Sequence, residues 1–335
     1  MQVFQYMLKF FCPGNSDEGV NMDQDSVSAE QTAAEHKHTG VTIDKKKLLK
    51  GSLITLLGGA CWGANGTLAK YLMETYSVDP LWLVCARELG SCWFFLATAY
   101  FMDKQNLKAA ATSKKTLWTI FIVGMAGILF NNISYLEAIH YTNSATATVM
   151  QSLNMVCILV WMALAHRAMP TGKELIGVAL ALIGTYLITT GGDIGQLKLP
   201  PMGIFWGLAT MLSSALFMVL PKNLLEKYGS FVVNGFAMLF TGVAFSLIVQ
   251  PWNMMPNLDG TGWFLVGVSV VVGTYGAYAM FLHGIKEIGS MRASMLGTVE
   301  PIMALVTSVL FMGTRFSFAE IIGFVLVMIM VVLTA

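Results

Sequence analysis

A chain of 335 residues in which 56% are apolar and only 12% are charged is too apolar for an ordinary soluble domain. Its formal net charge of +1 offers no sign of a nucleic-acid partner, and we expect none. The composition predicts a protein whose main solvent is the lipid bilayer.

The first 44 residues differ from the rest of the chain. Between Asn15 and Asp44 seven acidic residues stand against one lysine, Lys37, among Ser, Thr, Gln and Gly. Such a segment cannot bury enough apolar surface to fold, so residues 1–44 are predicted to form a disordered, acidic, cytoplasmic tail. The sequence has no CxxC motif and no Cys/His cluster at metal-ligand spacing. We therefore expect neither a metal site nor a cofactor.

Ten apolar runs follow the tail. A helix that crosses the hydrocarbon core needs about 20 mostly apolar residues, because no water there can satisfy the backbone. The runs lie near residues 51–71, 81–102, 116–138, 143–165, 173–190, 201–221, 231–250, 261–284, 290–313 and 317–335. Their connections are short and rich in proline, which leaves no room for a separate soluble domain. The predicted fold class is an all-α polytopic membrane protein.

The basic residues between these runs predict the orientation of the chain. If the N-terminus is cytoplasmic, only Lys70, Lys198 and Arg315 lie on the outer side. Fourteen lie on the inner side: Lys45, Lys46, Lys47, Lys50, Lys104, Lys108, Lys114, Lys115, Arg167, Lys173, Lys222, Lys227, Lys286 and Arg292. Cytoplasmic loops carry the excess of Lys and Arg, so both termini are expected in the cytoplasm of a multi-pass protein of the cell membrane.

The chain also aligns with itself. An offset of 152 residues pairs Gly51 with Gly203, Lys70 with Lys222 and Glu74 with Glu226; later, an offset of 146 pairs Ser144 with Ser290, Glu174 with Glu320 and Gly177 with Gly323. Two copies of five helices, at 48–190 and 201–335, enter the membrane from opposite faces, because five is odd. The sequence thus predicts two inverted five-helix repeats. Chance similarity between apolar helices is the alternative.

Several local stretches resemble the drug/metabolite transporter superfamily, in its ten-helix branch built from two EamA-type domains. The matching stretches are Trp62-Gly63-Ala64-Asn65, Arg87, and Leu296 to Phe311 with its Glu300-Pro301 pair. The resemblance covers about residues 48–335 and implies an exporter or importer of amino acids, nucleobases, sugars or similar solutes, often coupled to protons. One departure is that the Gly-Glu pair usual at the ends of helices four and nine is replaced by Arg167-Ala168 and Gly313-Thr314.

Polar side chains inside the predicted spans are the candidates for a site, since an ionisable residue in the membrane is costly and needs a cavity or a partner. Counting about 1.5 Å per residue puts Asn65, Arg87 and Asn131 at one depth, roughly 20 Å from the cytoplasmic surface, where the three can meet. The same counting puts Asn154 and Glu300, which the 146-residue offset pairs, about 15 Å deep, with Gln151 one turn away.

These six residues predict a central cavity that binds a small solute. In it, Arg87 attracts a carboxylate or phosphate, which makes the expected substrate anionic or zwitterionic, and the amides orient it. A solute near Arg87 would change whether Glu300 holds a proton, so protons are a candidate partner. The alternative is a structural network of buried polar groups that satisfy one another.

The predicted function is secondary transport of small metabolites by alternating access. The chain has no HExxH, no GxSxG and no pair of intramembrane aspartates, so it is not expected to be an enzyme. A non-transporting membrane subunit or a membrane-embedded enzyme stays the alternative. Beyond the lipid bilayer and the solute, the sequence is compatible with a homodimer.

Overall fold

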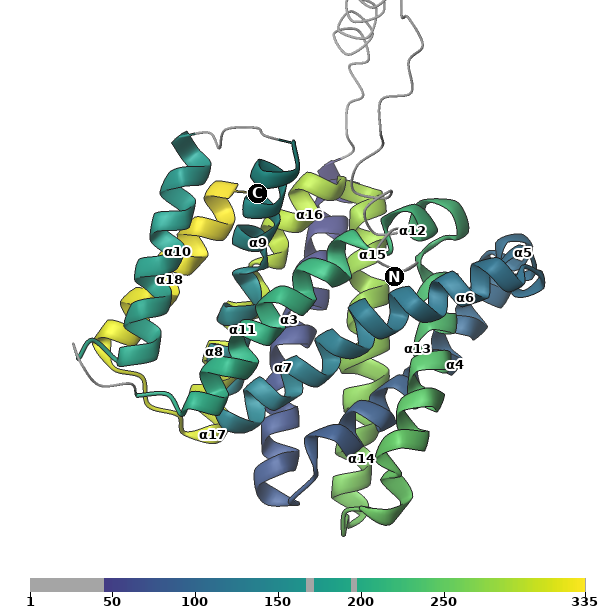
Figure 1. The fold of residues 1–335 in the computed structure, drawn as a ribbon, viewed down its shortest axis with the longest axis horizontal. Coiled ribbons are helices and arrows are strands. Elements are labelled where there is room, and N and C mark those ends of the chain that lie inside the picture. Colours follow the sequence, from purple (N-terminus) through teal and green to yellow (C-terminus); the bar gives the residue numbers. More distant parts are fainter. Residues whose placement is uncertain (1–44, 167–171, 194–197, 335) are drawn as a thin grey trace, which may run out of the picture.

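A computed structural model describes residues 45–166, 172–193 and 198–334, so the predicted tail at 1–44 lies outside the described residues. Every regular element in these ranges is helical. In chain order they are α3 (Lys45–Thr75), α4 (Pro80–Met102), α5 (Lys104–Thr112), α6 (Lys114–Val123), η1 (Gly124–Leu129), α7 (Phe130–Tyr141), α8 (Ser144–Ser152), α9 (Asn154–His166), α10 (Gly172–Thr190), α11 (Pro201–Val219), α12 (Lys222–Tyr228), α13 (Ser230–Val249), η2 (Pro251–Asn253), α14 (Gly260–Val268), η3 (Ser269–Gly276), α15 (Ala277–Ile288), α16 (Ser290–Gly297), α17 (Val299–Met312) and α18 (Phe318–Thr334) (Figure 1).

Each of the ten predicted spans falls on a helix or on consecutive helices that continue one another. Eight such segments in the described part of the chain are long and apolar enough to cross a membrane, and α18 adds a shorter apolar helix. The first predicted span, 51–71, lies within α3, which is 31 residues long. The prediction of an all-α polytopic membrane protein with ten transmembrane helices is confirmed.

Capping side chains start several of these helices at one end of the bundle. Asp79 accepts hydrogen bonds from the backbone N–H groups of Leu81 (2.8 Å) and Trp82 (3.3 Å), and Pro80 fills the first position of α4. Asp259 accepts from the N–H of Gly262 at 2.7 Å at the start of α14. At α18, Ser317 and Glu320 form a reciprocal capping box. These caps end the connections within a few residues, which keeps neighbouring helices adjacent.

The two halves of the chain pack as inverted copies of each other. Helix α3 of the first half packs on α15 and α17 of the second half. Its repeat counterpart in the second half, α11, packs on α7 and α8 of the first half. Helix α4 lies against its own counterpart α13, and α10 lies beside α18 at one edge of the bundle (left in Figure 1). This reciprocal pairing is what two inverted five-helix repeats require.

Two irregularities also occur in both halves. The third helix contains a π-helical segment, η1, and the eighth contains η3 at the equivalent place. The fourth helix breaks at Leu153, between α8 and α9, and the ninth breaks at Thr298, between α16 and α17. Pro301 explains the second break, because it lacks an N–H and its ring collides with the carbonyl four residues earlier. The first break has no such cause in the sequence, since Met155 stands in the place of Pro301.

Close helix packing depends on glycine where α3 crosses α17. A Cβ on Gly63 would come within 2.2 Å of the Glu300 carbonyl oxygen and 2.9 Å of the Ala304 nitrogen, both backbone atoms of α17. A side chain there would force the two helices apart. Gly63 therefore serves helix contact, as small residues do in membranes.

We expect Gly63→Ala to lower the free energy of unfolding by about 1–3 kcal/mol, the usual cost of overpacking a fixed contact. Chemical unfolding in detergent micelles, followed by circular dichroism, measures the change. Gly267→Ala is the matched control, because nothing lies within 4 Å of a Cβ at that position. Equal stability of the two variants would contradict the proposed helix contact.

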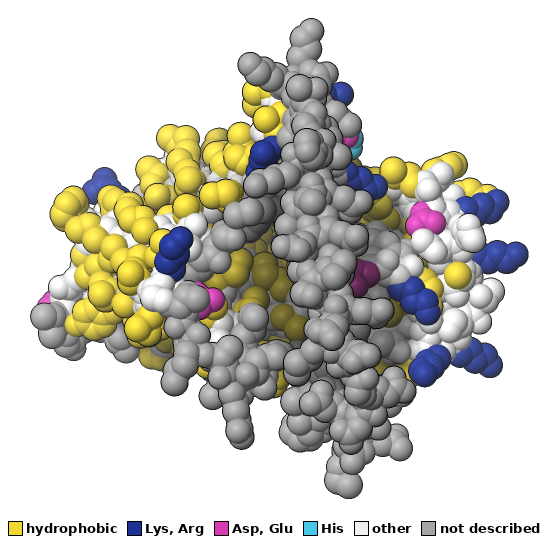
Figure 2. Space-filling view, turned by 90° about the horizontal axis from the view of Figure 1, so that it is seen from above, with side chains coloured by type: hydrophobic (Ala, Val, Ile, Leu, Met, Phe, Trp, Pro, Cys, Tyr) yellow, Lys and Arg dark blue, Asp and Glu magenta, His cyan; other side chains and the backbone are white. Residues whose placement is uncertain are grey.

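Basic side chains gather at one end of the bundle. Figure 2 views this end and shows Lys and Arg in dark blue around it. Helices α5, α6 and α12 contribute Lys104, Lys108, Lys114, Lys222 and Lys227. The loops that carry Lys198 and Arg315 connect helices at the opposite end. These seven basic residues thus lie at two opposite ends of the bundle, grouped as the sequence predicts; Arg167 lies outside the described residues.

Candidate functional site

Arg87 lies near the middle of α4 and is only 9% exposed. Its Nε donates a hydrogen bond to Thr274 Oγ1 at 3.1 Å, and the Thr274 hydroxyl donates to the Ser269 carbonyl at 2.9 Å. Its Nη1 is buried and has no hydrogen-bond partner within the described residues. No carboxylate in that part of the chain forms a salt bridge with Arg87. Within the described residues, the guanidinium is therefore a buried positive charge that forms no salt bridge.

Asn65, on α3, contacts the same π-helical segment, η3. It touches Gly273, the residue before Thr274, which binds Arg87. A Cβ on Gly273 would lie 2.2 Å from the Asn65 Cγ, so the side-chain amide rests directly on the Gly273 backbone. Asn65 is 3% exposed, and neither its Oδ1 nor its Nδ2 has a hydrogen-bond partner among the described residues. The structure thus brings Asn65 and Arg87 to consecutive residues of η3.

Asn131 points elsewhere. Its Oδ1 accepts hydrogen bonds from Ser214 at 2.7 Å and from Ser213 at 3.3 Å, both on α11. Asn65, Arg87 and Asn131 were expected to meet, but only two of them do. Asn65 and Arg87 both contact η3, whereas Asn131 contacts α11. The sequence placed all three at one depth but carried no information on the rotation of each helix.

Glu88, the neighbour of Arg87, is fully buried and satisfied by other helices. Its carboxylate accepts from Asn132 Nδ2 at 2.5 Å and from Thr241 Oγ1 at 2.9 Å. A step of one residue turns a helix by about 100°, which aims Glu88 away from the face of Arg87. Its bonds join α4 to α7 and α13 at the centre of the bundle. Glu88 thus links helices and forms no salt bridge with Arg87, although the two neighbouring opposite charges attract each other.

Asn154 and Glu300 occupy equivalent places at the two helix breaks. Asn154 is the first residue of α9 and is buried, with its Nδ2 3.5 Å from Met218 Sδ. Glu300 lies in the first turn of α17, is partly buried, and forms no salt bridge with any described residue. Gln151, in the last turn of α8, is also partly buried. All three lie beside a break, where the backbone leaves hydrogen-bonding groups unpaired.

A chain of hydroxyl groups that the sequence analysis missed joins α3, α8 and α17. Thr67 Oγ1 is 2.7 Å from both Ser144 Oγ and Thr307 Oγ1, and Ser144 Oγ is 2.8 Å from Ser308 Oγ. Thr307 donates onward to the Met303 carbonyl at 2.6 Å. Each hydroxyl has one proton, and these four bonds use all four. Hydroxyl side chains are common inside membrane helices, so the sequence held no signal that set these four apart.

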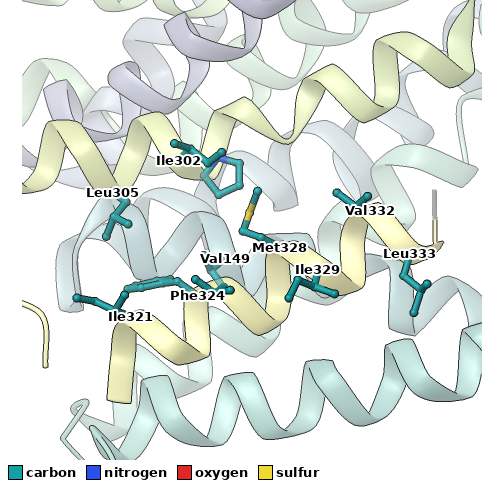
Figure 3. A pocket seen from close by; sticks show the side chains of 11 residues that line it. Val149, Ile302, Leu305, Ile321, Phe324, Met328, Ile329, Val332 and Leu333 are labelled. Atoms are coloured by element: carbon teal, nitrogen blue, oxygen red, sulfur yellow. The ribbon is translucent and has the colours of Figure 1, made fainter. Parts of the chain in front are cut away.

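Two cavities open on the side of the bundle. The lateral cavity, about 560 Å³, lies between α3, α14–η3 and α17 and is lined in part by Asn65. The other, a groove of about 530 Å³ between α17 and α18, is lined only by hydrocarbon and thioether side chains such as Ile302, Phe324 and Met328 (Figure 3). The groove has no hydrogen-bonding side chain and therefore cannot select a polar solute. No cluster of three metal-ligating side chains occurs in the described residues.

The same two-repeat architecture is found in known proteins. A model of the EamA-like transporter family matches residues 49–190 and again residues 201–335. The chain belongs to this family. A solved protein structure covers 85% of the chain and 96% of its own length with a TM-score of 0.57 at 19% identity, which shows a shared fold alone.

Curated relatives of this EamA-family protein are named as transporters. It is 31% identical to the uncharacterized inner membrane transporter YicL of Salmonella typhimurium, over 85% of this chain and 94% of that protein. It is 24% identical to the uncharacterized transporter YyaM of Bacillus subtilis, over 84% of this chain and 92% of that one. The GDP-fucose transporter 1 of Dictyostelium discoideum is 24% identical over 68% of this chain and 61% of its own length. The EamA-family protein is therefore a multi-pass membrane transporter by family.

Proposed function

We propose that this protein is a secondary transporter that moves a small anionic or zwitterionic metabolite across the cytoplasmic membrane by alternating access. The observation that carries the proposal is the Arg87 guanidinium, which is buried in a membrane helix and forms no salt bridge with any carboxylate of the described residues. An unpaired charge is costly inside the membrane and persists where function requires it. A carboxylate or phosphate on the solute would complete the pair through charge-assisted hydrogen bonds.

The surroundings of Arg87 support a small solute. Thr274 holds the Nε and thereby orients the guanidinium, while the Nη1 is free to donate. Asn65 offers an unpaired amide on the same η3 segment. Asn131, Gln151 and Asn154 supply further amides, which we assign to orienting the uncharged part of the solute.

Alternating access is supported by the irregularities shared by the two halves. The η1 and η3 segments, and the breaks at Leu153 and Thr298, give each repeat the same pair of weak points. π-Helical segments and breaks frequently lie at functional sites, where they let one part of a helix move relative to the other. If the two repeats exchanged their conformations, the site would open first to one side of the membrane and then to the other.

Proton coupling is assigned to Glu300. Its carboxyl group, at the start of α17, has no ion-pair partner in the described part of the chain, whereas Glu88 is held by two donors. A carboxyl group without fixed partners can gain and lose a proton without breaking the packing around it. Glu300 would then carry the proton while Arg87 binds the solute.

The test is flux into liposomes that contain only the purified protein. The panel of test compounds contains amino acids, nucleobases, sugar phosphates and a nucleotide sugar. The nucleotide sugar is included because a GDP-fucose transporter is among the relatives. We expect counterflow of at least one compound of the panel. The transported compound should carry a carboxylate or phosphate. Flux of neutral compounds alone would refute the role of Arg87. No flux of any panel member would favour the alternative, a non-transporting membrane subunit.

Both termini are proposed to lie in the cytoplasm, because the end of the bundle with most basic residues should face inward. A reporter inserted at Lys108 should then appear inside the cell and one at Gly260 outside. Reporter activity on the same side for both sites would contradict the ten-helix topology.

A further inference from the structure

The lateral cavity has the features of a second ligand site, which shares Asn65 with the proposed solute site beside Arg87. It is lined by one face of α3, which contributes Cys61, Asn65, Leu68 and Tyr71, together with residues of α14, η3 and α17. Most of the lining is apolar. The exception of interest is Asn65, which is 3% exposed and has both side-chain polar atoms unpartnered within the described residues. A buried amide that lacks partners costs free energy until something supplies its hydrogen bonds.

The other half of the protein lacks this arrangement. At the 152-residue offset, Phe217 occupies the place of Asn65, and at the 146-residue offset Gly127 occupies the place of Gly273. A Cβ on Gly127 would lie 3.3 Å from the Phe217 Cα, so the close approach of the two helices is conserved between the halves while the side chain differs. A phenyl ring needs no hydrogen bond. The unpaired amide is therefore found at the contact of α3 with η3 and has no counterpart at the equivalent contact of α11 with η1.

The cavity opens toward lipid. Val272, which flanks the cavity on η3, is 44% exposed and lies in the middle of a segment that is long and apolar enough to cross the membrane. Phe311, which flanks it on α17, is 74% exposed and lies at the end of that helix. A solute would enter sideways from the hydrocarbon region, where ions do not partition. The apolar walls accept a hydrocarbon body, and the amide accepts one polar group at its end.

We propose that the lateral cavity binds a small uncharged amphiphile from the bilayer, with an apolar body and one group that both donates and accepts hydrogen bonds, such as a primary amide. The group would pair with Oδ1 and Nδ2 of Asn65 in two parallel hydrogen bonds. Both atoms are buried, although the side chain lines the cavity. Binding therefore requires the amide group to rotate toward the cavity. This site goes beyond the proposed transport function: it shares Asn65 with the solute site, but its occupancy is tested without transport.

Cys61 gives a direct readout, because it lines the cavity and its thiol is free. In a variant that keeps only this cysteine, alkylation by membrane-permeant N-ethylmaleimide is followed by mass spectrometry in proteoliposomes. Benzamide is expected to slow the alkylation at least threefold and saturably. N,N-Dimethylbenzamide keeps the ring and the carbonyl but has no N–H donor, and it should protect less. In Asn65→Leu the difference between the two probes should vanish.

Cys157 is the matched control. It is partly exposed like Cys61 but lies on α9, away from the cavity lining. In a variant that keeps only Cys157, benzamide should leave the alkylation rate unchanged. Equal protection of both cysteines, or of neither, would overturn the proposal. If benzamide still protects Cys61 better than N,N-dimethylbenzamide in Asn65→Leu, by the same factor as with Asn65 present, the proposed role of Asn65 is wrong. Since alkylation is measured without transport, failure of this test leaves the flux experiment unaffected.

Discussion

Arg87→Ala is expected to lower the apparent affinity for a carboxylate- or phosphate-bearing substrate by roughly ten- to hundredfold. Hydrogen bonds to a charged group contribute about 1.5–3 kcal/mol, and about 1.4 kcal/mol corresponds to a factor of ten. The concentration dependence of counterflow in proteoliposomes measures the change. Arg87→Lys should restore part of the affinity, because it keeps the charge but loses the planar fork of donors.

Arg292→Ala is the control for this result, since it removes an arginine that is exposed at the start of the ninth transmembrane helix. It should leave the apparent affinity within twofold of the unaltered protein. If Arg87→Ala binds the substrate as tightly as Arg292→Ala does, Arg87 belongs to a structural network and the proposed anion site is wrong. Circular dichroism of both variants separates loss of binding from loss of folding.

Glu300→Gln is expected to retain substrate exchange but to abolish accumulation driven by a pH gradient. Glutamine keeps the shape and hydrogen-bonding capacity of the side chain but cannot release a proton. The measurement compares two fluxes in the same proteoliposomes: exchange at equal pH, and uptake with an imposed gradient. The gradient should stimulate uptake severalfold in the unaltered protein and have no effect on the variant.

Glu88→Gln is the comparison, because it neutralises a fully buried carboxylate on another membrane helix, α4. One of the two donors to Glu88 would then face an amide N–H group instead of an oxygen. We expect this variant to be less stable and its remaining flux to stay gradient-driven. Gradient-driven uptake by Glu300→Gln at the unaltered rate would exclude Glu300 as the proton carrier. Loss of the gradient effect in Glu88→Gln alone would assign the proton to Glu88.

The sequence by itself determined the membrane class, the ten helices and the inverted repeat. These follow from properties that are local or periodic: the length of apolar runs, the lysines and arginines between them, and matched residues at a constant offset. Pro301, which lacks an N–H group, likewise accounts for the break of the ninth helix at Thr298. The turn of about 100° between consecutive helical residues accounts for the direction of Glu88 away from the face of Arg87.

Only the tertiary structure decided which polar side chains meet. Depth along a helix can be counted from the sequence, but the rotation of each helix is set by packing against several others. Asn131 therefore turned to α11, while Asn65 and Arg87 met on η3. The π-helical segments and the break at Leu153 depend on the same packing, because an irregular backbone costs free energy that neighbouring helices must offset.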